Sequence, residues 1–428
     1  MNYQAIVFAG GSGSRMTSLT DYMPKPLLPV ANIPLFWYPL NMLSRSNITD
    51  IKLVTNEKCY PEISRMLTNG SLPALPNLTV DVIAVKPENG EEIDDWGTAD
   101  VLRHINSKID RKRDIILVTG DIVTDLELTG MLDFHKNNGS HLTCLFSELI
   151  LNGPVPGPKE RLRKYRDFTA LIPDTSQLLF LSEDEDFGDQ QEFDAALFRR
   201  YSKVMLSSTY KDVHVYAMNS QLLDIIEWDT SFSSVKADFI PYLLKCQYSR
   251  KSEKLQNLLN RVAKADDESF RCFAYRCGAA NATLVGHCNT ITAYFEANRA
   301  VQRVLKNLSM EVPEKSREEL KSNGTVVVDS TIGATGTTTD AKTAIKKSVV
   351  GNRCEIGANV KIESSLLMDD VKVKNGAVIK NSIVFPNVQI GEKSEVNMCI
   401  VSTGQTIGDK VKVVNEVISA EREMKLDD

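Results

Sequence analysis

The first half of the chain alternates short β-rich apolar runs with segments of helical periodicity. Residues 4–9 form an apolar run that ends in glycines, and three further runs of this kind follow. Residues 34–46 carry Phe36, Leu40 and Leu43 on one helical face, with Pro34 suited to the first turn. This alternation predicts a mostly parallel sheet with helices on both faces and a ligand site at the carboxyl ends of its strands. The three further strands are expected at residues 51–55, 80–85 and 114–119.

In the C-terminal part, aliphatic residues recur at every sixth position. Three series have this spacing: Val350, Ile356 and Ile362; Val384, Ile390 and Val396; Ile407 and Val413. A glycine directly follows four of them, at Gly351, Gly357, Gly391 and Gly408. Steps of six predict a triangular parallel β-helix, with one inward aliphatic residue on each side of a coil and glycine or asparagine at the corners. Chance spacing in a β-sandwich is the alternative, and the phased glycines disfavour it. The register is expected to break between Ser365 and Asn381.

These patterns predict two domains of different architecture. The first is an α/β domain with a Rossmann-like mixed sheet, and the second is a left-handed parallel β-helix of hexapeptide repeats. A charged stretch from Asn298 to Lys321 marks the boundary. We expect the α/β domain at residues 1–305, a linker at 306–322, the β-helix at 323–420 and a tail at 421–428.

Composition excludes several classes of function. The chain has 428 residues, with 50 basic and 56 acidic side chains, and its formal net charge of −6 does not indicate binding to a nucleic-acid backbone. The basic run at residues 159–166 is interpreted as a solvated loop. No apolar run approaches the roughly 18 residues of a membrane span, and the N-terminus lacks the pattern of a secretion leader. The eight cysteines form no C-x-x-C pair, which favours reduced thiols in a cytosolic protein.

A glycine-rich string directly follows the first predicted strand. Its candidate phosphate-binding residues are Gly10, Gly11, Gly13, Arg15 and Lys25. Glycines let the backbone N–H groups approach phosphate oxygens, and the two cations would bind the same anion. The string is not a Walker loop, since no G-K-[ST] follows. It is not the dinucleotide fingerprint either, because Met16 stands at the third glycine.

Residues 10–30 resemble the signature of sugar-nucleotide pyrophosphorylases, which reads G-G-x-G-x-R-L, P-L-T and P-K-P-L-x-P-V. In that family a sugar phosphate attacks the α-phosphorus of a nucleoside triphosphate, with magnesium neutralising charge. The resemblance implies a nucleotidyltransferase-like domain in which Arg15 and Lys25 hold the triphosphate. It also implies that Gly97 and Thr98 line the nucleotide pocket, and that Asp121 is the first magnesium aspartate.

Three departures from the family pattern affect the metal and the sugar. Counting back from the Y-x-E-A-N-like helix at residues 294–298 places His287 at the second metal aspartate and Asn289 at a glycine. The E-K-P element that holds the sugar is missing between about 165 and 210. Residues 212–214, which include His214, replace the N-A-G string before Tyr216. Because magnesium prefers hard oxygen ligands, these departures predict a domain with no catalytic residues and no metal site.

Several further strings resemble the gamma subunits of eukaryotic translation initiation factor 2B. They are residues 24–32, 36–41, 166–168, 240–243 and 414–418. The epsilon subunits share both domains but carry a further helical domain, for which the residues up to Asp428 leave no room. The resemblance implies a non-catalytic subunit of the guanine-nucleotide exchange factor for initiation factor 2. Its expected partners are the epsilon subunit, the beta and delta subunits, and the alpha subunit in the full complex.

Two other functions remain open at this point. One is an active sugar-1-phosphate nucleotidyltransferase like mannose-1-phosphate guanylyltransferase, and the other is a paralogue of that enzyme that senses sugar nucleotide. The retained glycine loop also has two explanations. In the first, the loop binds a nucleotide without turning it over, and no other cofactor is expected. In the second, its glycines and Arg15 are needed only to form the turn.

Overall fold

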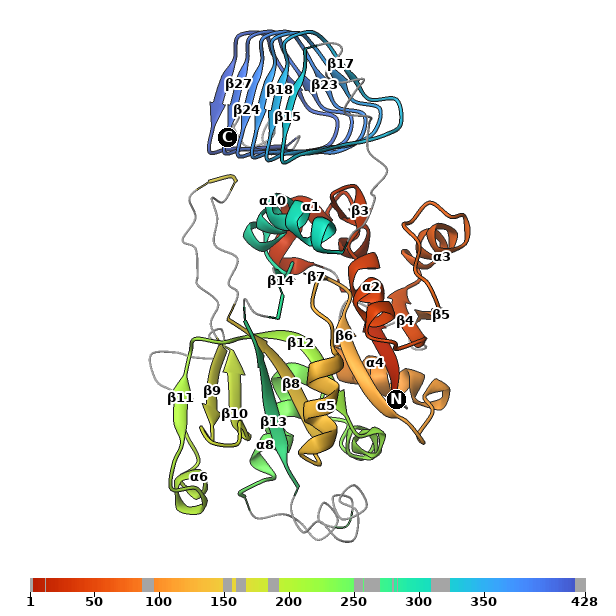
Figure 1. The fold of residues 1–428 in the computed structure, drawn as a ribbon, viewed down its shortest axis with the longest axis vertical. Coiled ribbons are helices and arrows are strands. Elements are labelled where there is room, and N and C mark those ends of the chain that lie inside the picture. The colour runs from red at the N-terminus through yellow and green to blue at the C-terminus, as the bar shows by residue number, and fades with distance from the viewer. Residues whose placement is uncertain are drawn as a thin grey trace, which may run out of the picture.

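A computed structural model shows an α/β domain with a triangular prism of short strands beside it (Figure 1). The structure describes residues 3–11, 13–86, 96–148, 156–158, 167–183, 192–249, 257, 270–278, 281–282, 284–308 and 324–419. The expected linker at 306–322 lies almost entirely outside these residues, and so does the expected tail. The expected domain bounds therefore stay predictions.

The main sheet of the α/β domain has seven strands in the order β13-β8-β12-β6-β1-β4-β5. Its strands are β1 (Tyr3–Phe8), β4 (Asp50–Asn56), β5 (Thr79–Val85), β6 (Asp114–Thr119), β8 (Leu142–Ser147), β12 (Lys211–Met218) and β13 (Cys272–Cys277). All pairs are parallel except those of β12, which runs antiparallel to both neighbours. The central strands are buried on both faces, as a helix-covered sheet requires. The predicted strands are thus confirmed to within one or two residues.

Helices cover both faces of this sheet. The described helices are α1 (Thr17–Thr20), α2 (Trp37–Arg45), α3 (Tyr60–Thr68), α4 (Thr98–Ile105), α5 (Thr129–Asn137), α6 (Ala195–Arg200), α7 (Leu223–Trp228), α8 (Ile240–Lys245) and α10 (Ile291–Asn307). Helix α2 begins three residues later than the sequence predicted. Pro34 lies in a hairpin strand instead of the first turn, because its segment pairs with residues 29–30.

Smaller sheets surround the carboxyl ends of the main strands. They contain β2 (Pro29–Val30) with β3 (Ile33–Pro34), β7 (Ile122–Thr124) with β14 (Val285–His287), and β9 (Asp167–Leu171) between β10 (Leu178–Glu183) and β11 (Met205–Ser207). A π-helix, η7 (Val235–Phe239), runs directly into α8. These elements bring distant parts of the chain together at the site that the sequence indicated.

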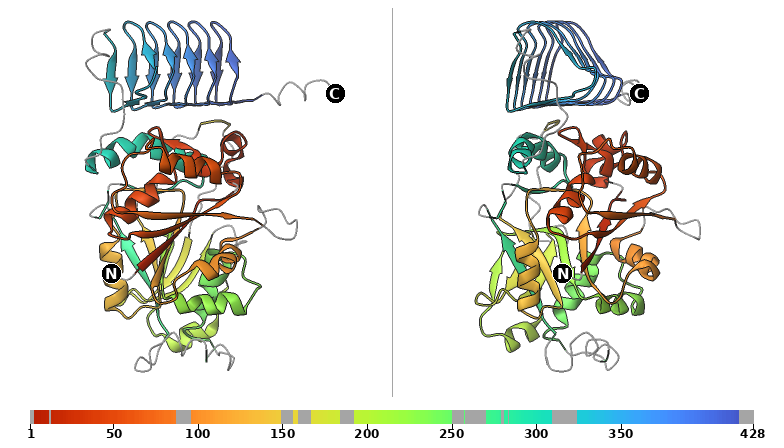
Figure 2. Two further views of the ribbon diagram at one scale, coloured as in Figure 1. Left: turned by 90° about the vertical axis from the view of Figure 1, so that its right-hand side faces the viewer. Right: turned by 45° about the vertical axis from the view of Figure 1, so that its right-hand side comes forward.

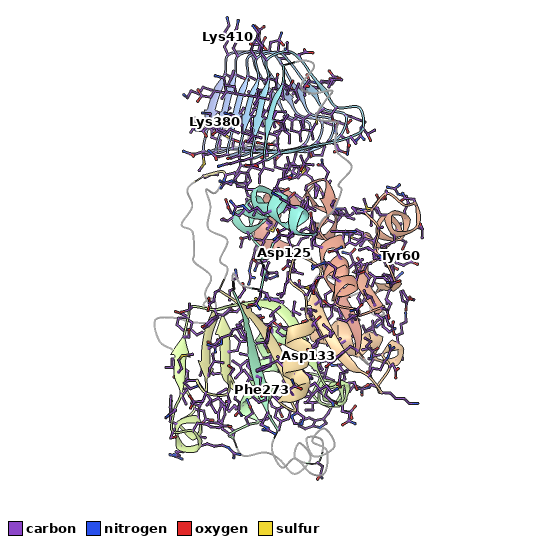
Figure 3. The ribbon with its side chains drawn as sticks, viewed as in Figure 1. Tyr60, Asp125, Asp133, Phe273, Lys380 and Lys410 are labelled. Carbon is purple, nitrogen blue, oxygen red and sulfur yellow. The ribbon has the colours of Figure 1, made fainter. Side chains whose placement is uncertain are left out.

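Three ladders of short parallel strands form the β-helix, one on each side of the prism (Figure 2). The first ladder contains β15 (Val326–Val328), β18 (Ala344–Lys346), β21 (Lys361–Glu363), β24 (Val378–Lys380), β27 (Glu395–Asn397) and β30 (Lys412–Val414). The second contains β16 (Thr331–Ile332), β19 (Val349–Val350), β22 (Leu366–Leu367), β25 (Ile383–Val384), β28 (Ile400–Val401) and β31 (Val417–Ile418). The third contains β17 (Thr338–Thr339), β20 (Glu355–Ile356), β23 (Lys372–Val373), β26 (Gln389–Ile390) and β29 (Thr406–Ile407). Inward residues such as Ile379 are fully buried, whereas Lys380 and Lys410 lie on the outside (Figure 3).

The aliphatic ladder continues through residues 365–381, so the expected break in register is wrong. Ile362 pairs with Ile379, which sets the coil at 17 residues. From Ile345 onward, two sides of each coil advance by six residues and the third by five, so Leu367 takes an inward position one residue early. Stacked side chains close this shorter corner, where Ser365 Oγ accepts a hydrogen bond of 3.2 Å from the backbone N–H of Ser382.

The glycines of the β-helix serve two purposes. Some allow close approach between coils, namely Gly333, Gly351, Gly357 and Gly391, and others have positive φ, namely Gly324, Gly336, Gly376 and Gly404. A Cβ at Gly351 would lie 2.5 Å from Asp369 Oδ1, and a Cβ at Gly391 would lie 2.4 Å from the carbonyl carbon of Gly408. Asparagine does occupy some positive-φ corners, but lysine and arginine share this role, as Lys342 shows at φ 60°. The expectation for the corners is therefore only partly correct.

One side of the prism packs on the α/β domain. Outward side chains of the second ladder, including Leu366 and Ile383, share a buried core with Trp37 and Tyr294 of the α/β domain. The tip of the β2–β3 hairpin adds a hydrogen bond of 3.0 Å from Asn32 Nδ2 to the carbonyl oxygen of Val350. Helix α10, α1 and β3 lie between the main sheet and the prism in both figures (Figures 1 and 2). The two domains therefore share an apolar interface.

All eight cysteines are buried, and none forms a disulfide bond. Within the described ranges, no helix is long and apolar enough to cross a membrane.

Candidate functional site

The glycine loop, which the structure describes at residues 9–11 and 13, joins β1 to a short 3₁₀ helix at Ser14–Met16. Gly13 has φ 73°, and a Cβ there would lie 2.5 Å from Thr20 Cγ2, so the turn itself requires glycine. Gly10 is close to the backbone of Asn56, where a Cβ would come within 3.3 Å of the nitrogen. Gly11 is different, because it is exposed and has nothing within 4 Å of an added Cβ. Packing therefore explains two of the three glycines.

Asp121 follows β6 and is bonded through both carboxylate oxygens. Lys25 Nζ contacts Oδ2, while the Thr119 hydroxyl donates to Oδ1. His287 Nε2, on β14, lies 3.0 Å from Oδ1. Burial alone would raise the pKa of Asp121, but His287 and Lys25 outweigh it and hold that pKa well below its ordinary value. The carboxylate is thus ionised, and the Lys25 ammonium already neutralises its charge.

His287 is buried beside Asp121, where the sequence count placed it. Burial lowers the pKa of the His287 imidazole in spite of Asp121, which favours the neutral ring. Its Nδ1 atom is buried without a hydrogen-bond partner among the described residues. A neutral ring that donates from Nε2 to Asp121 accounts for the 3.0 Å contact.

A second charged cluster surrounds Lys236 on the π-helix η7. Its ammonium lies 3.0 Å from Asp167 Oδ1, contacts Glu183 Oε1, and is 3.9 Å from Asp212 Oδ2. It is also 3.1 Å from His214 Nε2. Burial opposes the charge on Lys236, but the three carboxylates raise its pKa above the ordinary value. The second cluster is therefore a buried internal ion-pair network.

Asp212 is a fully buried carboxyl group of this cluster. Burial raises its pKa to about 6, although Lys236 works in the opposite direction. Its Oδ1 accepts the backbone N–H of His214 at 2.9 Å, and its Oδ2 accepts the Tyr216 hydroxyl at 2.6 Å. These two bonds hold the carboxyl group in place in either protonation state.

His214 connects the two clusters. It has φ 56°, a region that favours glycine, and it lies where the β12–β8 register shifts. Its ring centroid is 4.2 Å from that of His287, and its Nε2 faces Lys236. The imidazole therefore occupies space between the Asp121 cluster and the Lys236 cluster.

Arg15 reaches the same place from the glycine loop. Its guanidinium lies 3.6 Å from Glu183 Oε2, and about a third of its side chain is exposed. A cavity of about 280 Å³ adjoins this pair and is lined by Phe180, Leu181, Ser182, Glu183, Lys236, Ala237 and Pro241. The structure thus brings Arg15, Lys25 and Asp121 to one polar region.

Gly97 and Thr98 contact a neighbouring element of that region. A Cβ at Gly97 would lie 2.2 Å from the carbonyl oxygen of Ser233, and Thr98 Oγ1 accepts the backbone N–H of Val235 at 2.8 Å. These contacts support the π-helix that carries Lys236. Their expected place in a nucleotide pocket stays a prediction.

Sequence reasoning missed Lys236, Asp167 and Glu183. A signal for them existed, because Asp167 belongs to a string that resembles the gamma subunits and Glu183 ends a strand at the predicted edge. Glu183 does not match the E-K-P tripeptide, because acidic residues follow it in place of Lys-Pro.

The donor set does not suit magnesium. Magnesium prefers several hard oxygen ligands in octahedral geometry. Here the partners of Asp121 are an ammonium, a hydroxyl and an imidazole. The described part of the chain contains no group of three histidine, cysteine or acidic side chains that could hold a metal ion.

Comparison with known proteins first defines the class. A family model described as nucleotidyl transferase matches residues 4–149, and a model described as the EIF2B subunit epsilon LbH domain matches residues 313–413. The chain is thus a nucleotidyltransferase-type α/β domain followed by a left-handed β-helix, as the sequence predicted.

Individual relatives then give the family. A translation initiation factor eIF2B gamma subunit from Caenorhabditis elegans is 33% identical over 305 residues, which are 71% of this chain and 69% of the relative. The gamma subunit from Schizosaccharomyces pombe is 27% identical over 315 residues, 71% of this chain and 66% of the relative. A putative mannose-1-phosphate guanyltransferase from Sulfolobus acidocaldarius is 30% identical over only 148 residues, 34% of this chain and 37% of the relative. The chain belongs to the family of eIF2B gamma subunits, which makes it a component of a multi-subunit translation initiation factor.

Proposed function

We propose that the chain is a non-catalytic subunit of the guanine-nucleotide exchange factor for initiation factor 2. It would assemble in the cytosol with the epsilon subunit, dock on the beta and delta subunits, and join the alpha subunit in the full complex. GDP/GTP exchange would take place on the epsilon subunit, and this chain would promote it indirectly. Membership in the gamma family supports this assembly.

The bonding of Asp121 is the observation that carries the proposed loss of pyrophosphorylase chemistry. A metal ion at this carboxylate would have to displace Lys25, which now neutralises it, and His287, which now donates a hydrogen bond to it. A second acidic side chain would also be needed, and His287 occupies the adjacent position. Lys236 and His214 fill the space beyond it. An enzyme that transfers nucleotides by charge neutralisation would lack its main source of positive charge.

We also propose that the glycine loop binds a nucleotide without turning it over. Gly11 supports this, because neither packing nor positive φ explains a glycine there. Close approach of the backbone to a phosphate group would explain it. Gly10, Gly13, Arg15 and Lys25 would complete the contact with the phosphates.

Pyrophosphate release tests the absence of chemistry. The full chain would be incubated with magnesium, each nucleoside triphosphate and a panel of sugar 1-phosphates, beside an active pyrophosphorylase. We expect no release above the level of the Lys25→Ala variant. Release that Lys25→Ala abolishes would show an active transferase and overturn the proposal.

Affinity purification from cells tests the assembly. We expect the tagged chain to recover the other four exchange-factor subunits, together with exchange activity on initiation factor 2. Recovery of a mannose-type guanylyltransferase in their place would instead support a sugar-nucleotide sensor.

A further inference from the structure

The two cations that would bind the nucleotide phosphates, Arg15 and Lys25, each hold a carboxylate of the chain itself. The Arg15 guanidinium lies 3.6 Å from Glu183 Oε2. The Lys25 ammonium contacts Asp121 Oδ2. A phosphate group at the glycine loop would therefore meet cations whose charge is already balanced, and it would have to compete with these carboxylates for them.

Burial distinguishes the two ion pairs. The Lys25 and Asp121 side chains are 15% and 7% exposed. Those of Arg15 and Glu183 are 35% and 25% exposed, so water screens their contact and it contributes little to stability. Opening the buried pair would leave an uncompensated charge, whereas the Arg15–Glu183 pair can open at low cost. Lys25 can stay on Asp121 and still donate one of its remaining protons to a phosphate oxygen.

Glu183 can release Arg15 without becoming an isolated charge. Its other carboxylate oxygen, Oε1, contacts the Lys236 ammonium on the π-helix η7. Burial alone would raise the pKa of Glu183, but Lys236 and Arg15 outweigh it and hold that pKa below its ordinary value, so the carboxylate is ionised at neutral pH. The cavity of about 280 Å³ that Glu183 and Lys236 line gives the side chain space to move. One carboxylate thus links the glycine loop to the buried ion-pair network.

We propose that Glu183 is an internal competitor for the phosphate site, which holds Arg15 in the nucleotide-free chain and is displaced onto Lys236 alone when a nucleotide binds. Arg15 then donates its hydrogen bonds to phosphate oxygens, whose charge and geometry suit a guanidinium better than one carboxylate contact at 3.6 Å. The contact is autoinhibitory, because it lowers the affinity of the loop until phosphates replace it. The inference rests on the proposed nucleotide binding by the glycine loop and describes how that binding is regulated.

Calorimetric titration of the full chain with GTP and with ATP tests the proposal. Glu183→Gln removes the charge and keeps the size of the side chain. It should tighten the binding of at least one nucleotide about fivefold, since the competing ion pair and the repulsion between Glu183 and the phosphates are both lost. Asp174→Asn is the control, because it removes one negative charge from an exposed pair with Lys203 and should leave the affinity unchanged. Unchanged or weaker binding by Glu183→Gln would overturn the inference.

A double-mutant cycle with Arg15 separates competition from a general effect on the network. In the Arg15→Gln background, Glu183→Gln should no longer tighten binding, because the carboxylate has no guanidinium to occupy. A gain that persists without Arg15 would come from the released charge of Lys236 and would refute the assignment. Glu183→Asp is the alternative variant if Glu183→Gln does not fold. It keeps the charge of the network, and its shorter side chain should stay with the more buried Lys236, so it should tighten binding as well.

Thermal unfolding of the free chain tests whether the pair is structural instead. Arg15→Gln breaks only a partly exposed pair and should lower the unfolding temperature by no more than a few degrees. A larger fall would make the pair structural and overturn the inference.

The two proposals fail in different ways. Wild-type nucleotide binding that Glu183→Gln leaves unchanged refutes only the inference. A failure of GTP and ATP to bind either the wild type or Glu183→Gln refutes the inference together with nucleotide binding by the glycine loop. Pyrophosphate release from sugar 1-phosphates refutes the proposed loss of catalysis and leaves the role of Glu183 to be decided by the titrations.

Discussion

Replacing Lys236 by methionine should be among the most damaging single changes to the α/β domain. Methionine keeps the length of the side chain and removes only its charge. The Lys236 side chain is 10% exposed, and the side chains of Asp167 and Asp212 are 4% and 0% exposed. Without the ammonium, these buried carboxyl groups lose their main compensating charge.

The expected cost is about 3–5 kcal/mol of unfolding free energy at neutral pH, the usual result of removing one partner from a buried ion pair. The deficit should depend on pH through Asp212. Its pKa in the folded protein is about 6 with Lys236 present, above the ordinary 3.8, so the folded chain binds a proton more readily than the unfolded chain. A raised carboxyl pKa means that stability falls as pH rises through that window. Loss of Lys236 raises the pKa further, so the deficit of the variant should grow as the pH rises above 6.

Thermal unfolding followed by circular dichroism at about pH 5.5 and about pH 8 measures both effects. Lys245→Met is the matched control, because Lys245 lies 3.8 Å from Asp194 with 59% of its side chain exposed. That variant should unfold within a few degrees of the wild type, since exposed pairs contribute roughly 0–1 kcal/mol. Equal stability of Lys236→Met and the control at the higher pH would refute the role assigned to the buried network.

Three further outcomes follow from the geometry. Gly13→Ala should destabilise the chain by roughly 1–3 kcal/mol in chemical unfolding, because Gly13 has φ 73° and the added Cβ would meet the Thr20 side chain. Gly11→Ala should leave the stability unchanged and weaken nucleotide binding in a titration. Phe385→Ala removes a fully buried ring from the domain interface and should cost about 3–5 kcal/mol, visible as faster proteolysis between the domains. His287→Asp places a second carboxylate beside Asp121 and should strengthen manganese binding relative to the wild type, as measured by electron paramagnetic resonance.

Local patterns predicted most of the fold. The central strands follow from continuous apolar runs, and the β-helix follows from its period of six, because both patterns depend on burial of nearby residues. The 17-residue coil was missed, since its short corner shifts the phase by one residue in each turn, as between Ile362 and Leu367. The antiparallel strand β12 was missed as well. Buried polar residues such as Asp212 and Thr143 interrupt the apolar pattern there and in β8.

The candidate site could likewise be predicted from the sequence only in part. His287 and Asp121 could be brought together from the sequence, because a recognisable helix allowed residues to be counted back to β14. Lys236 could not, because its partners come from β9, β10 and β12, and the contact with Asp167 joins residues 69 positions apart. No short motif contains such a cluster. Only the packing of β9, β10 and η7 against the end of the main sheet shows it.

The signature string has a structural role that does not require catalysis. Its last two residues form β2 of the β2–β3 hairpin. At the hairpin tip that follows, the backbone N–H of Ala31 donates to Asn298 Oδ1 at 3.2 Å, and Asn32 bonds to Val350 of the β-helix. Tyr294 donates its hydroxyl proton to the carbonyl oxygen of Pro29 at 2.6 Å. Two of these contacts fix the hairpin on α10, and the contact of Asn32 joins it to the β-helix, whether or not a nucleotide reacts. A match to the pyrophosphorylase signature is therefore weak evidence for activity, and the side chains that decide it lie elsewhere, around Asp121 and His214.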